Sequence, residues 1–245
     1  MKTKIRKILL ALIVSLLILS GVGYAYLQSQ TYQPSPQAQK LYQQAQPQEI
    51  AGATLYQGQK DQPVFLFYTG ALVDPKAYAS LGKTLAEQGY STYIFHSPLN
   101  LPILDQAAAK NLIAKEKLEN RTIYLGGHSL GGVVASRAAK ELGGTVKGLI
   151  LLASYPDSKT DLSQQAPLAV LSLTADQDQV LKWPAYQAGK KLLPTSTIYT
   201  NISGGNHAGF GLYGPQKGDG KATISATNQQ ELVTQTILAF LKQEY

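Results

Sequence analysis

The chain has 245 residues, of which 44% are hydrophobic and 15% are charged, an ordinary composition for a globular fold that buries a sizeable core. It contains no cysteine, which excludes disulfides, a thiol nucleophile and cysteine-based zinc sites and fits an extracytoplasmic setting. The net charge is +7, but four basic residues lie within the first seven positions, and the remaining 18 basic residues face 15 acidic ones without a long basic run. We therefore expect no nucleic-acid partner.

The N-terminus is predicted to be a membrane-targeting segment. Basic residues precede Ile8 to Leu27, a stretch of twenty uncharged residues that is long enough to cross a bilayer core of about 30 Å. We favour an uncleaved signal anchor over residues 1–27; the alternative is a signal peptide cleaved after Gly23-Tyr24-Ala25, with secretion of the rest. The basic cluster should stay cytoplasmic, so the remainder of the chain is expected outside the cell.

Residues 28–49 are predicted to be a spacer. This segment holds nine glutamines and three prolines and is poor in the apolar residues that stabilise an ordered structure. A short helix over Gln37 to Ala45 is compatible with it. Residues 50–245 are then expected to form one domain.

From Ile50 onward, short apolar runs alternate with helical patterns. Asp74-Pro75 is typical of a helix start, Leu130 to Leu142 predicts a helix closed by Gly143-Gly144, and an apolar face from Leu232 to Leu241 predicts a C-terminal helix. This alternation predicts an α/β fold with a mainly parallel sheet covered by helices on both faces. The strands are expected at 64–68, 92–95, 122–125, 146–153, 168–173 and 197–202.

A serine stands where one predicted strand turns into a helix. Residues 127–131 read G-H-S-L-G, the G-x-S-x-G pattern in which a serine occupies a sharp strand-to-helix turn and small neighbours let the chain pass. Ser129 thus lies at the carboxyl end of a strand, where parallel sheets bind ligands. We predict Ser129 to be a nucleophile.

A serine nucleophile needs a base, and the chain offers three histidines. His96 precedes the nucleophile in the chain and His128 is adjacent to it on a sharp turn, so both are interpreted as structural. His207 follows the last predicted strand in a glycine-rich loop that is suited to bring an imidazole over Ser129. We therefore predict His207 to be the general base.

The acid that orients the base is expected between the serine and the histidine in chain order. The segment "VLSLTADQDQV" offers Asp178, which we prefer because it lies a few residues into the loop, and Asp176 as the alternative. Backbone N–H groups must stabilise the oxyanion. The expected donors are Leu130, at the start of the helix after the serine, and Ala71, in the loop after the first strand.

These motifs together resemble the α/β-hydrolase superfamily, in particular its small single-domain serine hydrolases related to the dienelactone-hydrolase group. The resemblance covers about Val64 to Leu241 and rests on "FYTGALVDPKAYASLGKTLAEQGY", "SPLNL", "GGHSLGG" and "GGNHAGFGLYG", which stand in the expected order. It implies Ser129 as nucleophile, Asp178 as acid and His207 as base, and it implies neither a metal nor an organic cofactor.

The expected function is a serine hydrolase that cleaves an ester-like acyl bond of a small-molecule or envelope-associated substrate. An acyltransferase with the same residues and a non-catalytic envelope-binding module are the alternatives. Ser154 to Pro167 comprise only fourteen residues, too few for a lid domain, so we expect an open cleft that favours short acyl chains. Residues 208–226 are the segment most able to cover it.

Overall fold

The computed structural model describes residues 2–50, 52–165 and 167–244. The chain forms two compact units, 1–31 and 32–245. The first unit is the helix α1 (Lys2–Ser29). Its segment Leu12–Ser29 has a mean hydropathy of 1.6 and no buried residue, so by length and composition it is able to cross a membrane. A signal sequence near the N-terminus has the same properties.

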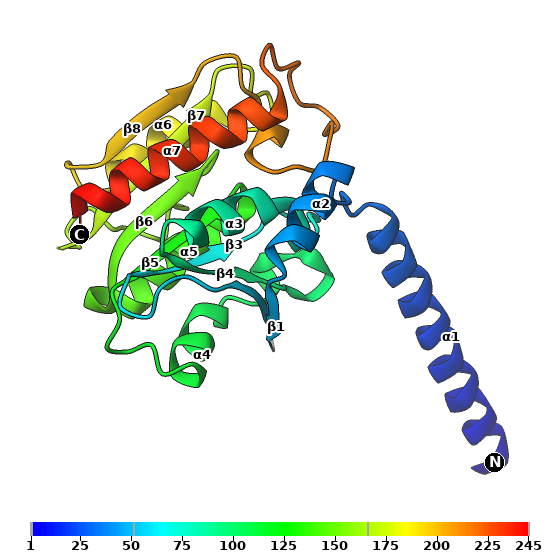
Figure 1. Ribbon diagram of the computed structural model, residues 1–245. Helices are drawn as coiled ribbons and strands as arrows, with labels where there is room; N and C mark the ends of the chain where they lie inside the picture. The colour runs from blue at the N-terminus through cyan, green and yellow to red at the C-terminus, as the bar shows by residue number, and fades with distance from the viewer. Residues whose placement is uncertain (1, 51, 166, 245) are drawn as a thin grey trace. The chain divides into compact units, whose positions relative to one another are not determined.

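The second unit contains an eight-stranded sheet (Figure 1). The strand order is β1-β2-β4-β3-β5-β6-β7-β8, with β1, β2 and β4 joined antiparallel and all other neighbours parallel. The fold is therefore the α/β arrangement that the sequence predicts. The strands are β1 (Gln48–Ile50), β2 (Ala53–Tyr56), β3 (Val64–Tyr68), β4 (Ser91–Phe95), β5 (Ile123–His128), β6 (Val146–Leu152), β7 (Ala169–Ala175) and β8 (Ile198–Ile202).

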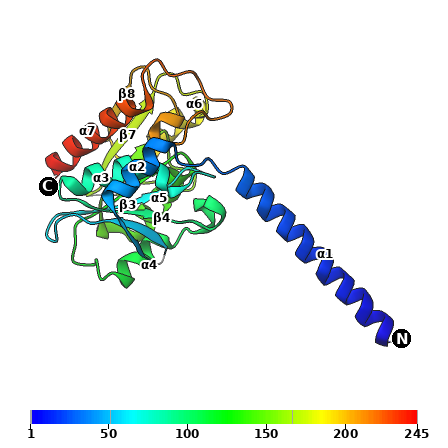
Figure 2. The ribbon, with the colours of Figure 1, turned by 45° about the vertical axis from the view of Figure 1, so that its right-hand side comes forward.

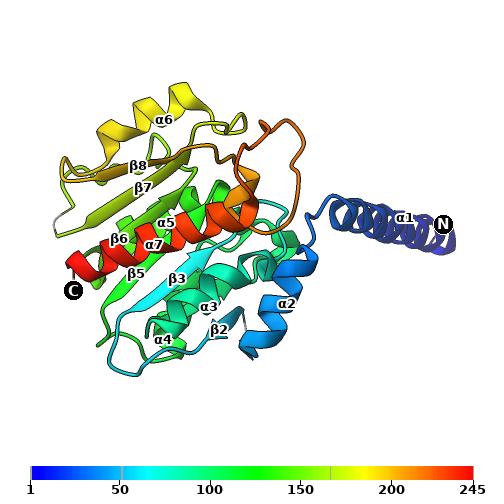
Figure 3. The ribbon, with the colours of Figure 1, turned by 45° about the horizontal axis from the view of Figure 1, so that its top comes forward.

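Helices cover both faces of the sheet. Successive residues of a strand point to opposite faces, and the central strands are buried along their whole length, so both faces must be covered. α3 (Ala79–Glu87) and α7 (Ala226–Glu244) lie on one face of the sheet, and α4 (Ala108–Lys115) and α5 (Leu130–Leu142) lie on the other (Figures 2 and 3). Phe65 and Phe67 of β3 belong to the core on the first face, whereas Leu66 belongs to the core on the second. The larger helices are α2 (Pro36–Ala45), α3 (Ala79–Glu87), α4 (Ala108–Lys115), α5 (Leu130–Leu142), α6 (Trp183–Gly189) and α7 (Ala226–Glu244).

The segment 32–49 is packed more closely than the predicted spacer, and it contains the short helix that the sequence allows over Gln37 to Ala45. Its residues 36–45 form α2, which lies beside α3 in Figure 3, and Tyr32 and Ser35 make backbone hydrogen bonds to Leu72 and Leu212. Ser35 caps α2 by accepting a hydrogen bond from the backbone of Ala38. The glutamines hide this packing in the sequence, because the few apolar residues between them lie on one face of a short helix.

Two further differences concern short elements. The antiparallel pair β1 and β2 was not predicted, nor were α4 and α6, which are eight and seven residues long. Patterns this short give weak periodic signals. The predicted start at Asp74 is confirmed, since the Asp74 carboxylate accepts a hydrogen bond from the Lys76 backbone at 2.8 Å, although the first turn is a 3₁₀ helix, η1 (Pro75–Tyr78).

Candidate active site

Ser129 lies on the sharp turn between β5 and α5. Its backbone dihedrals are φ 52° and ψ −121°, a conformation that costs a non-glycine residue of order 1–3 kcal/mol. The surrounding structure holds the turn: the Ser129 N–H donates to the carbonyl of Leu152 at 2.9 Å, and the Ser154 hydroxyl donates to the Ser129 carbonyl at 2.7 Å. The turn is thus fixed from β6, which runs beside β5.

The flanking glycines are required by close approach of the backbone. A Cβ atom on Gly127 would lie 2.3 Å from the carbonyl carbon of Gly131, and one on Gly131 would lie 2.2 Å from the carbonyl oxygen of Thr69. Both distances are far below van der Waals contact, so any side chain there would push α5 away from β5 or β3. The glycines therefore serve the turn that presents Ser129.

His207 and Asp178 form a buried pair. The His207 Nδ1 and Asp178 Oδ2 atoms are 2.8 Å apart, and each residue is 2% exposed. The other carboxylate oxygen of Asp178 accepts hydrogen bonds from the backbone N–H groups of Val180 and Leu181, both at 2.8 Å. Because a carboxylate only accepts, Nδ1 of His207 must donate, which leaves Nε2 free to accept a proton.

Asp176, the alternative acid, has a different position. It is exposed and accepts hydrogen bonds from the Gly204 backbone at 2.8 Å and from the Ser203 hydroxyl at 3.3 Å. It therefore stabilises the turn after β8, and in the described residues no hydrogen bond joins it to His207. The structure brings Asp178, the preferred residue, to the histidine.

His207 lies next to the serine turn. Its ring centroid is 4.6 Å from that of His128, the residue immediately before Ser129. In the described part of the chain the Ser129 hydroxyl has no hydrogen-bond partner, and Ser129 is partly exposed. In proteins without bound substrate, catalytic hydrogen bonds are often not yet formed.

The loop that carries His207 is held from α7 and from the following segment. Gln229, which is fully buried, accepts a hydrogen bond from the Asn206 N–H at 3.0 Å and donates to the Asn206 carbonyl at 2.8 Å. Asp219 accepts from the Ala208 N–H at 2.8 Å. Neither Gln229 nor Asp219 was predicted from the sequence, because a buried glutamine in a helix and an aspartate in a long loop have no local signature.

His128 and Tyr78 form a second buried layer beneath the site. The Tyr78 hydroxyl accepts from the Gly70 N–H at 2.8 Å and lies 2.9 Å from His128 Nδ1. Burial raises the pKa of Tyr78, so its hydroxyl stays protonated, and it shares a hydrogen bond with Nδ1 of His128. Burial, assisted by the neighbouring His207, lowers the pKa of His128 well below its usual range, so this imidazole is neutral. The expected structural role of His128 agrees with this position.

Two backbone N–H groups are available near Ser129. In the described residues, the N–H groups of Ala71 and Leu130 have no acceptor, whereas the N–H of Gly70, just before Ala71, donates to the Tyr78 hydroxyl. Leu130 is the first residue of α5, where the helix dipole favours negative charge. His96, in contrast, lies just after β4, and its Nε2 is 2.7 Å from the hydroxyl of Thr54 in β2.

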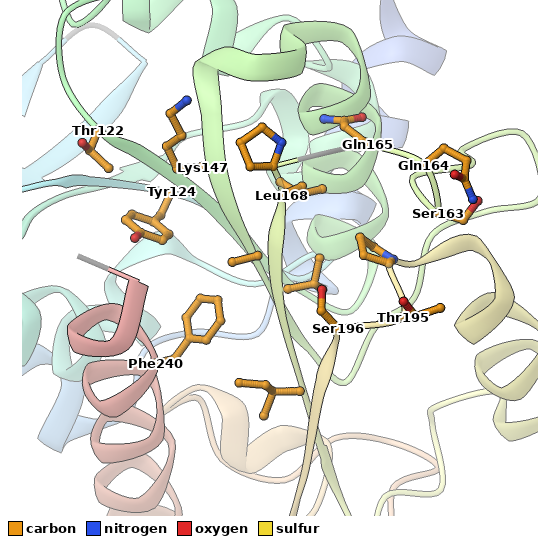
Figure 4. A pocket seen from close by; sticks show the side chains of 15 residues that line it. Thr122, Tyr124, Lys147, Ser163, Gln164, Gln165, Leu168, Thr195, Ser196 and Phe240 are labelled. Carbon is orange, nitrogen blue, oxygen red and sulfur yellow. The ribbon is translucent and has the colours of Figure 1, made fainter.

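A separate cavity of about 710 Å³ lies at the other end of the strands (Figure 4). Its lining includes Thr122 just before β5, Lys147 at the start of β6, and Leu168 just before β7, whereas Ser129 follows the carboxyl end of β5. Neither Ser129, Asp178 nor His207 lines it. The residues with hydrolytic chemistry therefore do not belong to this cavity.

Comparison with known proteins agrees with this fold. A family model described as "Alpha/beta hydrolase family" matches residues 64–231. No curated protein matches the chain significantly. The narrower resemblance to the dienelactone-hydrolase group stays a prediction.

Solved structures share the fold at low sequence identity. Carboxylesterase CesB from Bacillus subtilis has a TM-score of 0.59 at 12% identity, over 91% of this chain and 98% of its own. Est1E from Butyrivibrio proteoclasticus has a TM-score of 0.56 at 16% identity, over 80% and 98%. An alpha/beta hydrolase enzyme, MGS-MChE2, from the metagenome of sediments of the Mar Chica lagoon in Morocco has a TM-score of 0.59 at 16% identity, over 81% and 99%.

Proposed function

The chain belongs to the alpha/beta hydrolase family, and we propose that it is a serine hydrolase that cleaves an ester-like acyl bond with Ser129, His207 and Asp178. The observation that carries the proposal is the buried pair of His207 and Asp178, whose imidazole ring lies beside the strained serine turn. Carboxylesterase CesB, which shares the fold, gives the reaction class additional support.

In the proposed reaction, Ser129 Oγ attacks the carbonyl carbon of the ester while its proton passes to His207 Nε2. The negative charge that develops on the carbonyl oxygen is stabilised by the N–H groups of Ala71 and Leu130. The bond to the leaving alcohol then breaks, and the alcohol takes the proton from His207. Water attacks the acyl-enzyme through the same base, releases the carboxylic acid and restores the Ser129 hydroxyl.

Asp178 supports this sequence by holding the His207 tautomer. Its contact to Nδ1 keeps Nε2 deprotonated before attack and stabilises the imidazolium afterwards. The two N–H donors on its other oxygen keep the carboxylate itself in one orientation. No metal or organic cofactor enters any step.

The substrate is proposed to be a short acyl ester, either a small molecule or a group on an envelope component. Between β6 and β7 the described residues contain neither helix nor strand, which supports a site without a lid domain. The segment after His207 packs back on the domain: Phe210 and Leu212 are buried, and the Leu212 N–H donates to the carbonyl of Ala77 at 2.8 Å. We further propose that α1 anchors the enzyme in the membrane with the catalytic domain outside the cell.

A fluorophosphonate probe tests the proposal, because it reacts only with an activated serine. Wild-type protein should be labelled, whereas Ser129→Ala and His207→Ala should lose labelling while circular dichroism shows a folded protein. Ser203→Ala is the matched control, since Ser203 lies in a turn on the exposed surface. Labelling of Ser129→Ala at the wild-type level, or no labelling of the wild type, would refute the proposed nucleophile.

A further inference from the structure

The segment just before α2 contacts the loop that carries Ala71. The Tyr32 N–H donates to the Leu72 carbonyl at 2.7 Å, and the Asp74 N–H donates to the Tyr32 carbonyl at 3.0 Å, so Tyr32 pairs with Val73 as a one-residue parallel bridge. We call residues 32–35 the N-terminal strap. The backbone immediately before and after Val73 is thereby hydrogen-bonded to a residue about forty positions earlier in the chain.

The direction of the Ala71 N–H depends on this contact. The Val73 N–H donates to the Gly70 carbonyl at 3.3 Å, which closes a turn over Ala71 and Leu72. The Gly70 carbonyl and the Ala71 N–H belong to one planar trans peptide and point in opposite directions. A bond that draws the Gly70 carbonyl toward Val73 therefore turns the Ala71 N–H away from the turn's interior and keeps it free.

The turn needs external support because its backbone is strained. Leu72 has φ 56°, a left-handed conformation that a leucine rarely adopts, and the Leu72 N–H is taken by the Asn100 carbonyl at 2.6 Å. With the Leu72 carbonyl bound by Tyr32, both backbone groups of this residue are engaged from outside the turn. Without the strap, Leu72 has one of these two restraints left.

The strap also connects the loop to the segment that follows His207. The Tyr32 ring lies 5.3 Å from that of Tyr213, and the Ser35 N–H donates to the Leu212 carbonyl at 2.7 Å. We infer that the N-terminal strap is a positioning element of the active site, in which Tyr32 fixes the turn 70–73 so that the Ala71 N–H is aimed at the oxyanion. This inference rests on the proposed function for its catalytic consequence.

Three variants of the full-length chain separate the backbone contact from the side chain. Tyr32→Ala removes the ring and keeps the N–H, whereas Tyr32→Pro removes the ring and the N–H donor to Leu72. Gln44→Ala, at an exposed position of α2, is the control. Kinetics are measured on a short p-nitrophenyl ester and expressed per active site, counted by fluorophosphonate labelling. Hydrogen exchange is followed on peptides that cover 69–78 and 123–128.

Loss of an oxyanion donor lowers kcat by about 10²–10³. A donor that is still present but points in the wrong direction should cause a smaller decrease in kcat. We expect Tyr32→Pro to lower kcat about 10- to 100-fold relative to Tyr32→Ala with KM within about twofold, and to bind an alkyl boronic acid correspondingly more weakly. Exchange should accelerate in 69–78 and stay unchanged in 123–128. Gln44→Ala should match the wild type throughout.

The inference is overturned if Tyr32→Pro and Tyr32→Ala have the same kcat per active site, even when the melting temperature falls, because the strap would then be structural only. Unchanged exchange in 69–78 overturns it as well. The hydrogen-exchange measurement does not depend on catalytic activity. A wild type that is not labelled would refute the proposed function alone, while the exchange data would still decide whether the strap holds the turn.

Discussion

Asp178→Asn is the sharpest test of the proposed catalytic pair, because the surroundings of the carboxylate dictate how an amide must sit. One side-chain oxygen accepts from the N–H groups of Val180 and Leu181, both at 2.8 Å. An asparagine can satisfy these two donors only with its carbonyl oxygen, which directs its NH₂ group at His207 Nδ1. The reverse orientation would set an NH₂ group against two N–H donors.

The expected loss of activity follows from the tautomer that this amide imposes. With an NH₂ donor opposite, Nδ1 of His207 must accept, so the ring proton moves to Nε2 and the base can no longer take the proton of Ser129. Loss of the orienting carboxylate also removes stabilisation of the imidazolium. We expect kcat/KM to fall by about 10⁴, which corresponds to about 5.4 kcal/mol at 1.36 kcal/mol per factor of ten.

The assay is hydrolysis of p-nitrophenyl acetate by purified Asp178→Asn, with folding checked by circular dichroism. Asp176→Asn is the matched control, and its activity should stay within about threefold of the wild type, because an exposed asparagine still accepts from the Gly204 N–H through its carbonyl oxygen. The reasoning is refuted if Asp178→Asn keeps more than about a tenth of the wild-type activity, or if Asp176→Asn is the more damaging change.

Tyr78→Phe leaves the buried Gly70 N–H without its acceptor, so urea unfolding should show a loss of about 1–3 kcal/mol in the free energy of unfolding. Tyr155→Phe, at a half-buried tyrosine, is the control and should lose less than about 0.5 kcal/mol; equal losses would contradict the role of the Tyr78 hydroxyl. The free energy of unfolding should fall as the pH drops below about 6.5, with a slope that approaches 1.4 kcal/mol per pH unit. The reason is that His128 binds a proton in the unfolded chain, whereas in the folded chain its lowered pKa keeps it neutral. His128→Gln should remove this part of the slope, and an unchanged slope would show that another group is responsible. Among p-nitrophenyl esters of two to sixteen carbons, kcat/KM should be highest from acetyl to butyryl; a steady rise beyond eight carbons would contradict the open cleft. The full-length protein should stay with membranes in high salt, since insertion of an apolar helix is not screened, whereas a mature protein that begins near Tyr26 in the medium would show cleavage.

Much of the fold was predictable because local patterns and the sheet agree. The buried strands β3 to β7 are continuous apolar runs, and their order in the chain, with helices between them, leaves a mainly parallel sheet as the consistent solution. Ser129 was identifiable because the constraint on its turn is local: the glycines that it needs are two residues away on either side, at 127 and 131.

The segment 32–49 and the choice between Asp176 and Asp178 were less accessible. Both aspartates follow β7 within three residues, and only the path of the loop after β8 decides which carboxylate meets His207. Likewise, nothing near Tyr32 indicates that it pairs with Val73. Such contacts join residues that are tens of positions apart, and their free energy exists only once the chain has closed around them.

The sequence by itself determined the strands β3 to β8, the serine turn, the set of candidate acids and bases, and the apolar N-terminal helix, since each depends on a short local stretch of residues. Tertiary structure alone decided the burial of the pair His207 and Asp178, the neutral state of His128, and the attachment of Tyr32 to the loop of Ala71. The physical reason is that burial, the pKa values that follow from it and hydrogen bonds between distant segments are properties of the packed chain and not of any local stretch.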